Sequence, residues 1–257
     1  MNKVEAINEK AKGYQQVLAQ PWNVLGYSLR QHNLAKHLAE AVSILDIGGG
    51  SAQEAVDLAR LGHMVVVLEP STEMAKQART NIEAAGLASC IQLYDTELDK
   101  AQEYLEAEAF DVILCHNVLQ YLPDREKALG QMAQYLKPGG LLSLVSLNKY
   151  SEPFRLATQQ QSIARAREAL AATSYTTEAL GVEVALLTVE DVTELAKTAG
   201  LSNIAQYGIR CINDYVLDNP SKTPESILDL ELELCDRYPY YLLARFFHLL
   251  FEKVSVS

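Results

Sequence analysis

Residues 43–69 have the sequence SILDIGGGSAQEAVDLARLGHMVVVLE. The apolar run Ser43–Ile47 predicts a strand, three glycines follow at once, and a helical pattern runs from about Ser51 to Leu61. A second apolar strand, Met64–Leu68, ends directly before Glu69. An acid about 20 residues after a glycine-rich first turn is typical of a site for a ribose diol, because a carboxylate accepts two hydroxyl protons.

The turn Gly48-Gly49-Gly50 lets a ligand approach the backbone more closely than any side chain would permit. A dinucleotide site requires the spacing G-x-G-x-x-G/A, and counting from Gly48 places Gln53 at the final small position. Asp46, before the turn, would lie badly beside a pyrophosphate but suits a cationic ligand. The sequence therefore favours S-adenosylmethionine, which carries no phosphate, over a nicotinamide dinucleotide.

The order D-x-G-G-G resembles that of class I S-adenosylmethionine-dependent methyltransferases. The resemblance implies an α/β fold with a doubly wound, Rossmann-like sheet of seven mostly parallel strands and an antiparallel last strand. It also implies a cofactor site formed by Arg30, Asp46, Gly48, Gly49, Gly50, Gln53, Glu69, Pro70, Met74, Leu98, Asp99 and His116.

Apolar strands alternate with helical patterns along the chain, as this fold requires. We predict strands at Ser43–Ile47, Met64–Glu69, Ile91–Tyr94, Asp111–Cys115 and Leu141–Leu147. We expect helices near Ser51–Leu61, Thr72–Ala85, Glu97–Ala107 and Arg125–Leu136. The tetrapeptide Lys137-Pro138-Gly139-Gly140 predicts a turn ahead of the fifth strand.

We expect one methyltransferase domain with additions to the minimal fold. Its parts are N-terminal helices at 1–41, broken at Gln20-Pro21-Trp22-Asn23, a cofactor-binding core at 42–149, a mostly helical cover at 150–188, and the rest of the sheet at 189–257.

The sequence pattern after residue 187 predicts one helix and two strands. Thr188 caps the helix, with Asp191 three residues on, and the helix ends at Gly200. Asn203–Cys211 and Tyr241–Phe251 are expected to form an antiparallel pair of strands.

Composition argues against several classes of protein. The chain is 49% hydrophobic and 21% charged, as globular proteins are, and no apolar run reaches the ~18 residues of a membrane span. The polar N-terminus does not resemble a signal peptide, and the four cysteines form no C-x-x-C pair. We therefore expect a reduced, cytoplasmic protein without structural metal. A net charge of −11 argues against a broad nucleic-acid footprint but not against a local basic patch, and no surface stripe indicates an oligomeric state.

Several candidate residues have structural alternatives. Asp46 would equally hold the following turn by a side-chain hydrogen bond to the backbone. Asp99 lies where the family contacts the adenine amino group, but Asp95 and Glu97 compete for that role. His116, at the end of the fourth predicted strand, lines the cofactor pocket or is a structural histidine with satisfied hydrogen bonds.

Motifs along the whole chain also resemble those of the bacterial tRNA 5-carboxymethoxyuridine methyltransferase family. They are Leu29-Arg30-Gln31, Leu45-Asp46-Ile47-Gly48-Gly49-Gly50, Gly62-His63-Met64-Val65, Cys115-His116-Asn117-Val118-Leu119, Gly208-Ile209-Arg210-Cys211-Ile212-Asn213-Asp214-Tyr215, and Glu231-Leu232-Glu233 through Arg237-Tyr238. The last two lie outside the generic cofactor fold and are more specific than the glycine turn. The chain departs from this family at Ala52, where the family has glycine.

By this resemblance, Arg30 would hold the methionine carboxylate of the cofactor in a bidentate pairing that lysine cannot copy. Arg210, Tyr215 and Arg245 become candidates for binding the acidic group of the substrate. The alternatives are that Arg210 only pairs with Asp214 and that Arg245 belongs to a core strand.

The resemblance implies methyl transfer to a carboxylate oxygen, such as that of 5-carboxymethoxyuridine in tRNA. A carboxylate needs no general base, so we predict no catalytic acid–base residue. A small acidic or phenolic metabolite is the alternative acceptor, because Asp218–Asp236 is acidic and phosphate contacts require bases. A protein that binds the cofactor without turnover is the non-enzymatic hypothesis. A basic strip would favour tRNA, and its candidate residues are Lys149, Arg155, Arg165, Arg167 and Arg210.

Overall fold

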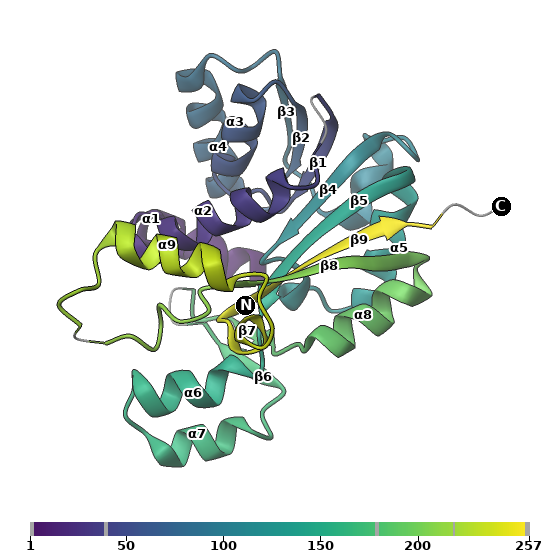
Figure 1. Cartoon of the computed structure of the whole chain (residues 1–257). Helices are drawn as coiled ribbons and strands as arrows, with labels where there is room; N and C mark the ends of the chain where they lie inside the picture. Colours follow the sequence, from purple (N-terminus) through teal and green to yellow (C-terminus); the bar gives the residue numbers. More distant parts are fainter. Residues whose placement is uncertain (1–2, 39–40, 178–179, 218, 255–257) are drawn as a thin grey trace.

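In the computed structural model, which describes residues 3–38, 41–177, 180–217 and 219–254, seven strands form one sheet in the order β3-β2-β1-β4-β5-β9-β8 (Figure 1). The strands are β1 (Ser43–Ile47), β2 (Met64–Leu68), β3 (Ile91–Tyr94), β4 (Phe110–His116), β5 (Leu136–Leu147), β8 (Leu201–Ile209) and β9 (Phe246–Lys253). The first five run parallel, and β9 is antiparallel to both of its neighbours. The predicted fold class is confirmed.

Helices cover both faces of this sheet, because successive strand residues point to opposite sides. Ile44 packs with the helices of one face and Leu45 with those of the other. The first face carries α2 (Pro21–Ala35), α3 (Gln53–Arg60), α4 (Thr72–Ala85) and α9 (Pro224–Leu234). The second carries α5 (Arg125–Tyr135), α8 (Val189–Thr198) and the 3₁₀ segment η1 (Leu98–Glu103).

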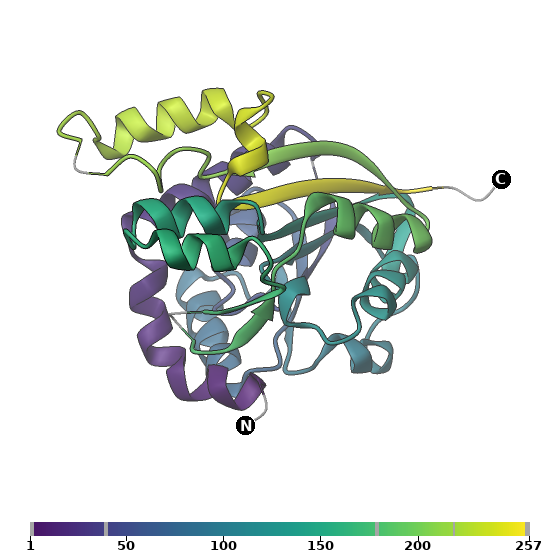
Figure 2. The same ribbon diagram turned by 90° about the horizontal axis from the view of Figure 1, so that it is seen from below.

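The cover between β5 and α8 contains α6 (Ser151–Thr158), α7 (Ile163–Ala169) and a small hairpin of β6 (Ser174–Thr176) and β7 (Glu183–Ala185). We predicted a mostly helical cover, and its two helices agree with that prediction, whereas the hairpin was not predicted. Its strands contain Tyr, Thr and Val, which favour extended structure. Figures 1 and 2 show α6 and α7 side by side, outside the main sheet.

Three other predictions were wrong in detail. The expected helix Glu97–Ala107 is only the 3₁₀ segment η1, in which Leu98 and Ala101 alone are buried. The expected strand Tyr241–Phe251 begins later, because Leu242 and Leu243 are exposed and belong to a 3₁₀ turn, η3 (Tyr240–Leu243). Strand β5 begins before the Lys-Pro-Gly-Gly segment, since Leu136 already pairs with Phe110. Helix α9 was not predicted.

The N-terminal helices and the cap of α8 were predicted correctly. Helix α1 (Lys3–Leu18) ends before α2, in which Pro21 occupies the first turn, where its missing N–H costs nothing. In α8 the Thr188 Oγ1 accepts from the Asp191 N–H at 3.1 Å, and the Thr188 N–H donates to the Asp191 carboxylate at 3.0 Å. This reciprocal pair is a capping box.

Replacing Thr188 by alanine should lower the free energy of unfolding by about 1 kcal/mol, because the start of α8 loses its side-chain acceptor. Thr193→Ala, within the same helix, removes a half-buried hydroxyl that caps nothing and should be neutral or slightly stabilising. Urea unfolding measures both variants. Equal losses for the two would show that the cap does not contribute.

Candidate functional site

The carboxyl ends of β1, β2 and β4 meet at one edge of the sheet, because these strands are parallel and adjacent. The glycine turn follows β1, Glu69 follows β2, and His116 ends β4. The structure therefore brings together three of the features that we predicted for the cofactor site.

The glycine turn is closed on its inner side and open at Gly50. A Cβ atom on Gly49 would lie 2.5 Å from the Asp46 Oδ2 and 2.7 Å from a methyl group of Val67. Gly48 and Gly50 have φ values of +66° and +57°, which side chains rarely adopt. A Cβ on Gly50 would meet no heavy atom within 4 Å, so the turn leaves space for a ligand there.

Glu69 joins the glycine turn to the start of α4. Its Oε2 accepts from the Gly50 N–H and its Oε1 from the Ser71 N–H, both at 2.8 Å. Pro70 lies between Glu69 and Ser71 in the sequence, and the Ser71 hydroxyl caps α4 by accepting from the Met74 N–H at 3.2 Å. Burial raises the pKa of Glu69, and the two N–H donors only partly offset that effect. A carboxylate has about four acceptor positions, so ribose hydroxyls can bind without displacing either amide.

Asp46 is a buried carboxylate with an unused acceptor. It is 3% exposed, and its Oδ2 has no hydrogen-bond partner among the described residues. Burial, together with Glu54 and Glu69, raises the pKa of Asp46 well above its usual value. A buried polar atom without a partner is costly, and a cationic ligand would supply the missing interaction.

Arg30 and Glu54 face each other from α2 and α3. The Arg30 Nη2 lies 3.7 Å from the Glu54 carboxylate, while the Arg30 Nε is buried without a partner in the described part of the chain. Both Glu54 oxygens lie 3.0 Å from the His116 Nδ1. Burial would raise the pKa of Glu54, but His116 and Arg30 lower it to about 2. We did not predict Glu54, because one acid near a helix start carries no specific signal.

His116 belongs to a row of polar side chains across three strands. Its Nε2 lies 2.8 Å from the Ser143 hydroxyl, which in turn lies 2.8 Å from the Nε2 of His248. Both ring nitrogens of His116 therefore have protein partners, as the structural alternative requires. A contact between His116 and the cofactor remains a prediction.

The other predicted cofactor residues differ in burial and in their side-chain partners. Leu98 is buried at the start of η1. Asp99 next to it is exposed and forms an ion pair with Lys127 at 3.0 Å. Gln53 is exposed at the start of α3, and its side chain donates to Asp57 at 3.2 Å.

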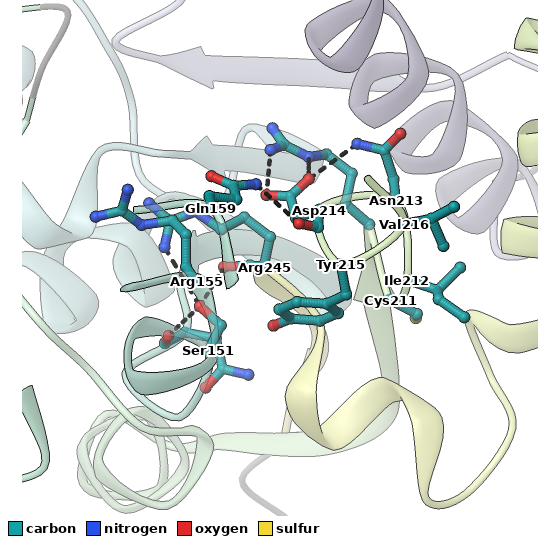
Figure 3. A network of polar contacts seen from close by, with 12 residues as sticks. Ser151, Arg155, Gln159, Cys211, Ile212, Asn213, Asp214, Tyr215, Val216 and Arg245 are labelled. Atoms are coloured by element: carbon teal, nitrogen blue, oxygen red, sulfur yellow. Dashed lines mark hydrogen bonds and ion pairs between the residues drawn. The ribbon is translucent and has the colours of Figure 1, made fainter. Parts of the chain in front are cut away.

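The predicted substrate residues lie at the same edge of the sheet, where β8 ends and β9 begins. Figure 3 shows two of them, Tyr215 and Arg245. Arg210 is paired with Asp214, to which its Nε donates at 2.8 Å. Arg245 is paired with Glu152 through its Nη1, and the Tyr215 hydroxyl donates to a backbone carbonyl at 2.7 Å. Burial would raise the pKa values of the two carboxylates, but the arginines lower them.

Both arginines keep part of the guanidinium group for other partners. Asp214 engages the Nε and Nη2 of Arg210, and the Nη1 donates to no described residue. Only the Nη1 of Arg245 donates to Glu152 and the nearby Ser151 within the described chain. Arg210 is 9% exposed and Arg245 is 7% exposed, so only a small part of each side chain lies at the surface. The ion pair of Arg210 with Asp214 is thus present, and substrate binding by Arg210 remains a prediction.

The expected basic strip does not form from these residues. Arg155 is buried and paired with Glu152, and Arg210 is buried as well. Arg165 and Arg167 are exposed on α7. Across the described ranges, no three His, Cys, Asp or Glu side chains gather to hold a metal, and no helix is long and apolar enough for a bilayer.

Comparisons with known proteins indicate the family of this chain. A family model described as a methyltransferase domain matches residues 45–144. The tRNA 5-carboxymethoxyuridine methyltransferase of Escherichia coli strain K12 is 26% identical over 228 residues, which cover 86% of this chain and 83% of that protein. A ubiquinone biosynthesis O-methyltransferase of Xanthomonas axonopodis pv. citri is 33% identical over 114 residues, which cover 44% of this chain and 46% of that protein.

A solved S-adenosylmethionine-dependent methyltransferase from Thermotoga maritima has the same fold, with a TM-score of 0.67 at 17% identity, and the match covers 98% of this chain and 99% of that one. The sheet order, the family model and the curated relatives lead to one conclusion. The chain is a class I S-adenosylmethionine-dependent methyltransferase.

Proposed function

We propose that this methyltransferase esterifies a carboxylate, and that the acceptor is 5-carboxymethoxyuridine in tRNA. The observation that carries the proposal is the pair of buried arginines, Arg210 and Arg245, at the carboxyl edge of the sheet, whose guanidinium groups keep N–H donors that no described residue accepts. A guanidinium group binds a carboxylate by parallel, charge-assisted hydrogen bonds. A phenolic oxygen would use only part of such a site.

The extent of the sequence matches supports the same acceptor. The Escherichia coli relative matches over 228 residues, so its similarity extends well beyond the domain at 45–144. The ubiquinone enzyme matches over 114 residues. Substrate selection in open α/β sheets depends on segments outside the strands, so similarity there bears on the acceptor.

The described residues also fit the cofactor. Arg30 has an unpartnered buried Nε for a carboxylate, Asp46 has an unpartnered Oδ2 for a cationic group, and Glu69 keeps acceptor positions for a diol. When bound, S-adenosylmethionine supplies an electrophilic methyl group on a sulfonium. The acceptor oxygen would bond to that methyl carbon as the carbon–sulfur bond breaks, and sulfur would keep the electron pair. No proton moves, so the protein acts by positioning and by excluding water.

A small acidic metabolite is the second candidate acceptor. Arg155 and Arg210 are buried, so they cannot form the exposed strip that would meet RNA phosphates. The chain also carries 33 acids against 22 bases. A small carboxylate would need the arginines but no phosphate contacts.

The proposal is tested by incubating the protein with methyl-labelled S-adenosylmethionine and tRNA from a strain lacking this gene. We expect base-labile label on that tRNA, because an ester is cleaved by base, and none on wild-type tRNA, where the acceptor is already methylated. Label resistant to base would contradict carboxylate esterification. Binding of S-adenosylhomocysteine without any transfer to tRNA would favour the metabolite.

Gly49→Ala should weaken cofactor binding, because its Cβ would displace the Asp46 side chain or move the turn. Such overpacking costs about 1–3 kcal/mol. We expect a lower melting temperature and a smaller stabilisation by S-adenosylhomocysteine, both measured by thermal unfolding. Gly130→Ala is the matched control: Gly130 is exposed in α5, nothing obstructs its Cβ, and the variant should be neutral or more stable. Full stabilisation of Gly49→Ala by the ligand would contradict the assigned turn.

A further inference from the structure

A buried acid on α9 contacts the loop that follows Arg210. Glu231 has no exposed surface, and its carboxylate accepts three successive backbone N–H groups. The Oε2 accepts from Cys211 at 2.6 Å, and the Oε1 accepts from Ile212 and Asn213 at 2.9 and 2.7 Å. Successive N–H groups that point to one side form an anion-binding concavity. In this protein the anion is supplied by the chain itself.

The loop needs this acceptor because its conformation is unusual. Arg210 has a φ of +61°, in the left-handed region that residues with a Cβ rarely adopt. The following residues Cys211 and Asn213 are buried, so their N–H groups would otherwise lack partners. The carboxylate of Glu231 therefore stabilises a turn that the backbone would not favour alone.

This turn determines how both arginines are placed. It brings Asp214 back to the guanidinium group of Arg210, and the Asn213 side chain donates to the same carboxylate at 2.9 Å (Figure 3). The backbone carbonyl of Arg210 accepts from the Arg245 N–H at 3.0 Å. A change in the loop would thus move the ion pair of Arg210 and the start of β9 together.

We propose that Glu231 is a positioning residue for acceptor recognition, an inference that rests on the proposed function. Its carboxylate fixes loop 210–214, so that the N–H groups of Arg210 left by Asp214 face the acceptor carboxylate. Glu231 has no exposed surface and its carboxylate is occupied by backbone N–H groups, so its expected role is indirect. Its effect should therefore appear in acceptor binding alone.

The test uses Glu231→Gln, which keeps the side-chain shape but replaces one acceptor oxygen by an NH₂ donor facing backbone N–H groups. We expect the Kd for tRNA from the gene-deleted strain, measured with saturating S-adenosylhomocysteine, to rise roughly 10- to 100-fold. The Kd for S-adenosylhomocysteine should stay within about twofold, and the amides of Cys211, Ile212 and Asn213 should exchange hydrogen faster. Glu233→Gln removes the same charge from an exposed position of α9 and should change none of these values.

A double variant separates positioning from general stability. If Glu231 acts through Arg210, Glu231→Gln should weaken tRNA binding less in the Arg210→Lys background than in the wild-type protein. The inference would be overturned if Glu231→Gln weakened tRNA binding by the same factor in both backgrounds. It would also be overturned if the variant lost affinity for S-adenosylhomocysteine as strongly as for tRNA. If the Glu231→Gln variant bound this tRNA as tightly as the wild-type protein does, the inference would be overturned and the proposed function would stand. Failure of the wild-type protein to bind this tRNA would overturn both.

Discussion

The requirement that a buried carboxylate be surrounded by hydrogen-bond donors shapes both halves of this protein. Glu69 meets it with the amides of Gly50 and Ser71, and so joins the glycine turn to α4. Glu231 meets it with three amides after β8. In each case the acid orders a loop at the carboxyl edge of the sheet, where the backbone has no strand partner. The two loops are therefore built on the same physical principle.

Local patterns predicted most of the fold. The apolar runs, the glycine turn and the Thr188 cap depend on neighbours within a few residues, so β1 to β4 and the start of α8 lie close to where we expected them. The polar contacts could not be predicted in this way. Glu54 meets His116, 62 residues away, and Glu231 meets a loop about 20 residues before it. Only the folded chain shows why these acids are needed.

Ala52 illustrates a departure whose cost only the structure shows. It has a φ of +59° directly before α3, which explains why glycine would be favoured at this position.

The net charge of the chain is an incomplete guide to its binding partners. The excess of acids is a property of the whole chain, whereas Arg155, Arg210 and Arg245 are buried in pairs and contribute little to the exposed charge. A site for an acidic group can therefore exist in an acidic protein.

The long connection between β8 and β9 contains Arg210, Glu231 and Arg245, and none of the residues predicted to bind the cofactor. Its ends are joined by the antiparallel pairing of two neighbouring strands. Replacing this connection would change the predicted acceptor residues and leave the sequences of the strands and of the glycine turn unchanged. An exchange of this segment between relatives would therefore change the predicted acceptor residues together, and the new segment would have to keep the packing of α9 against α2.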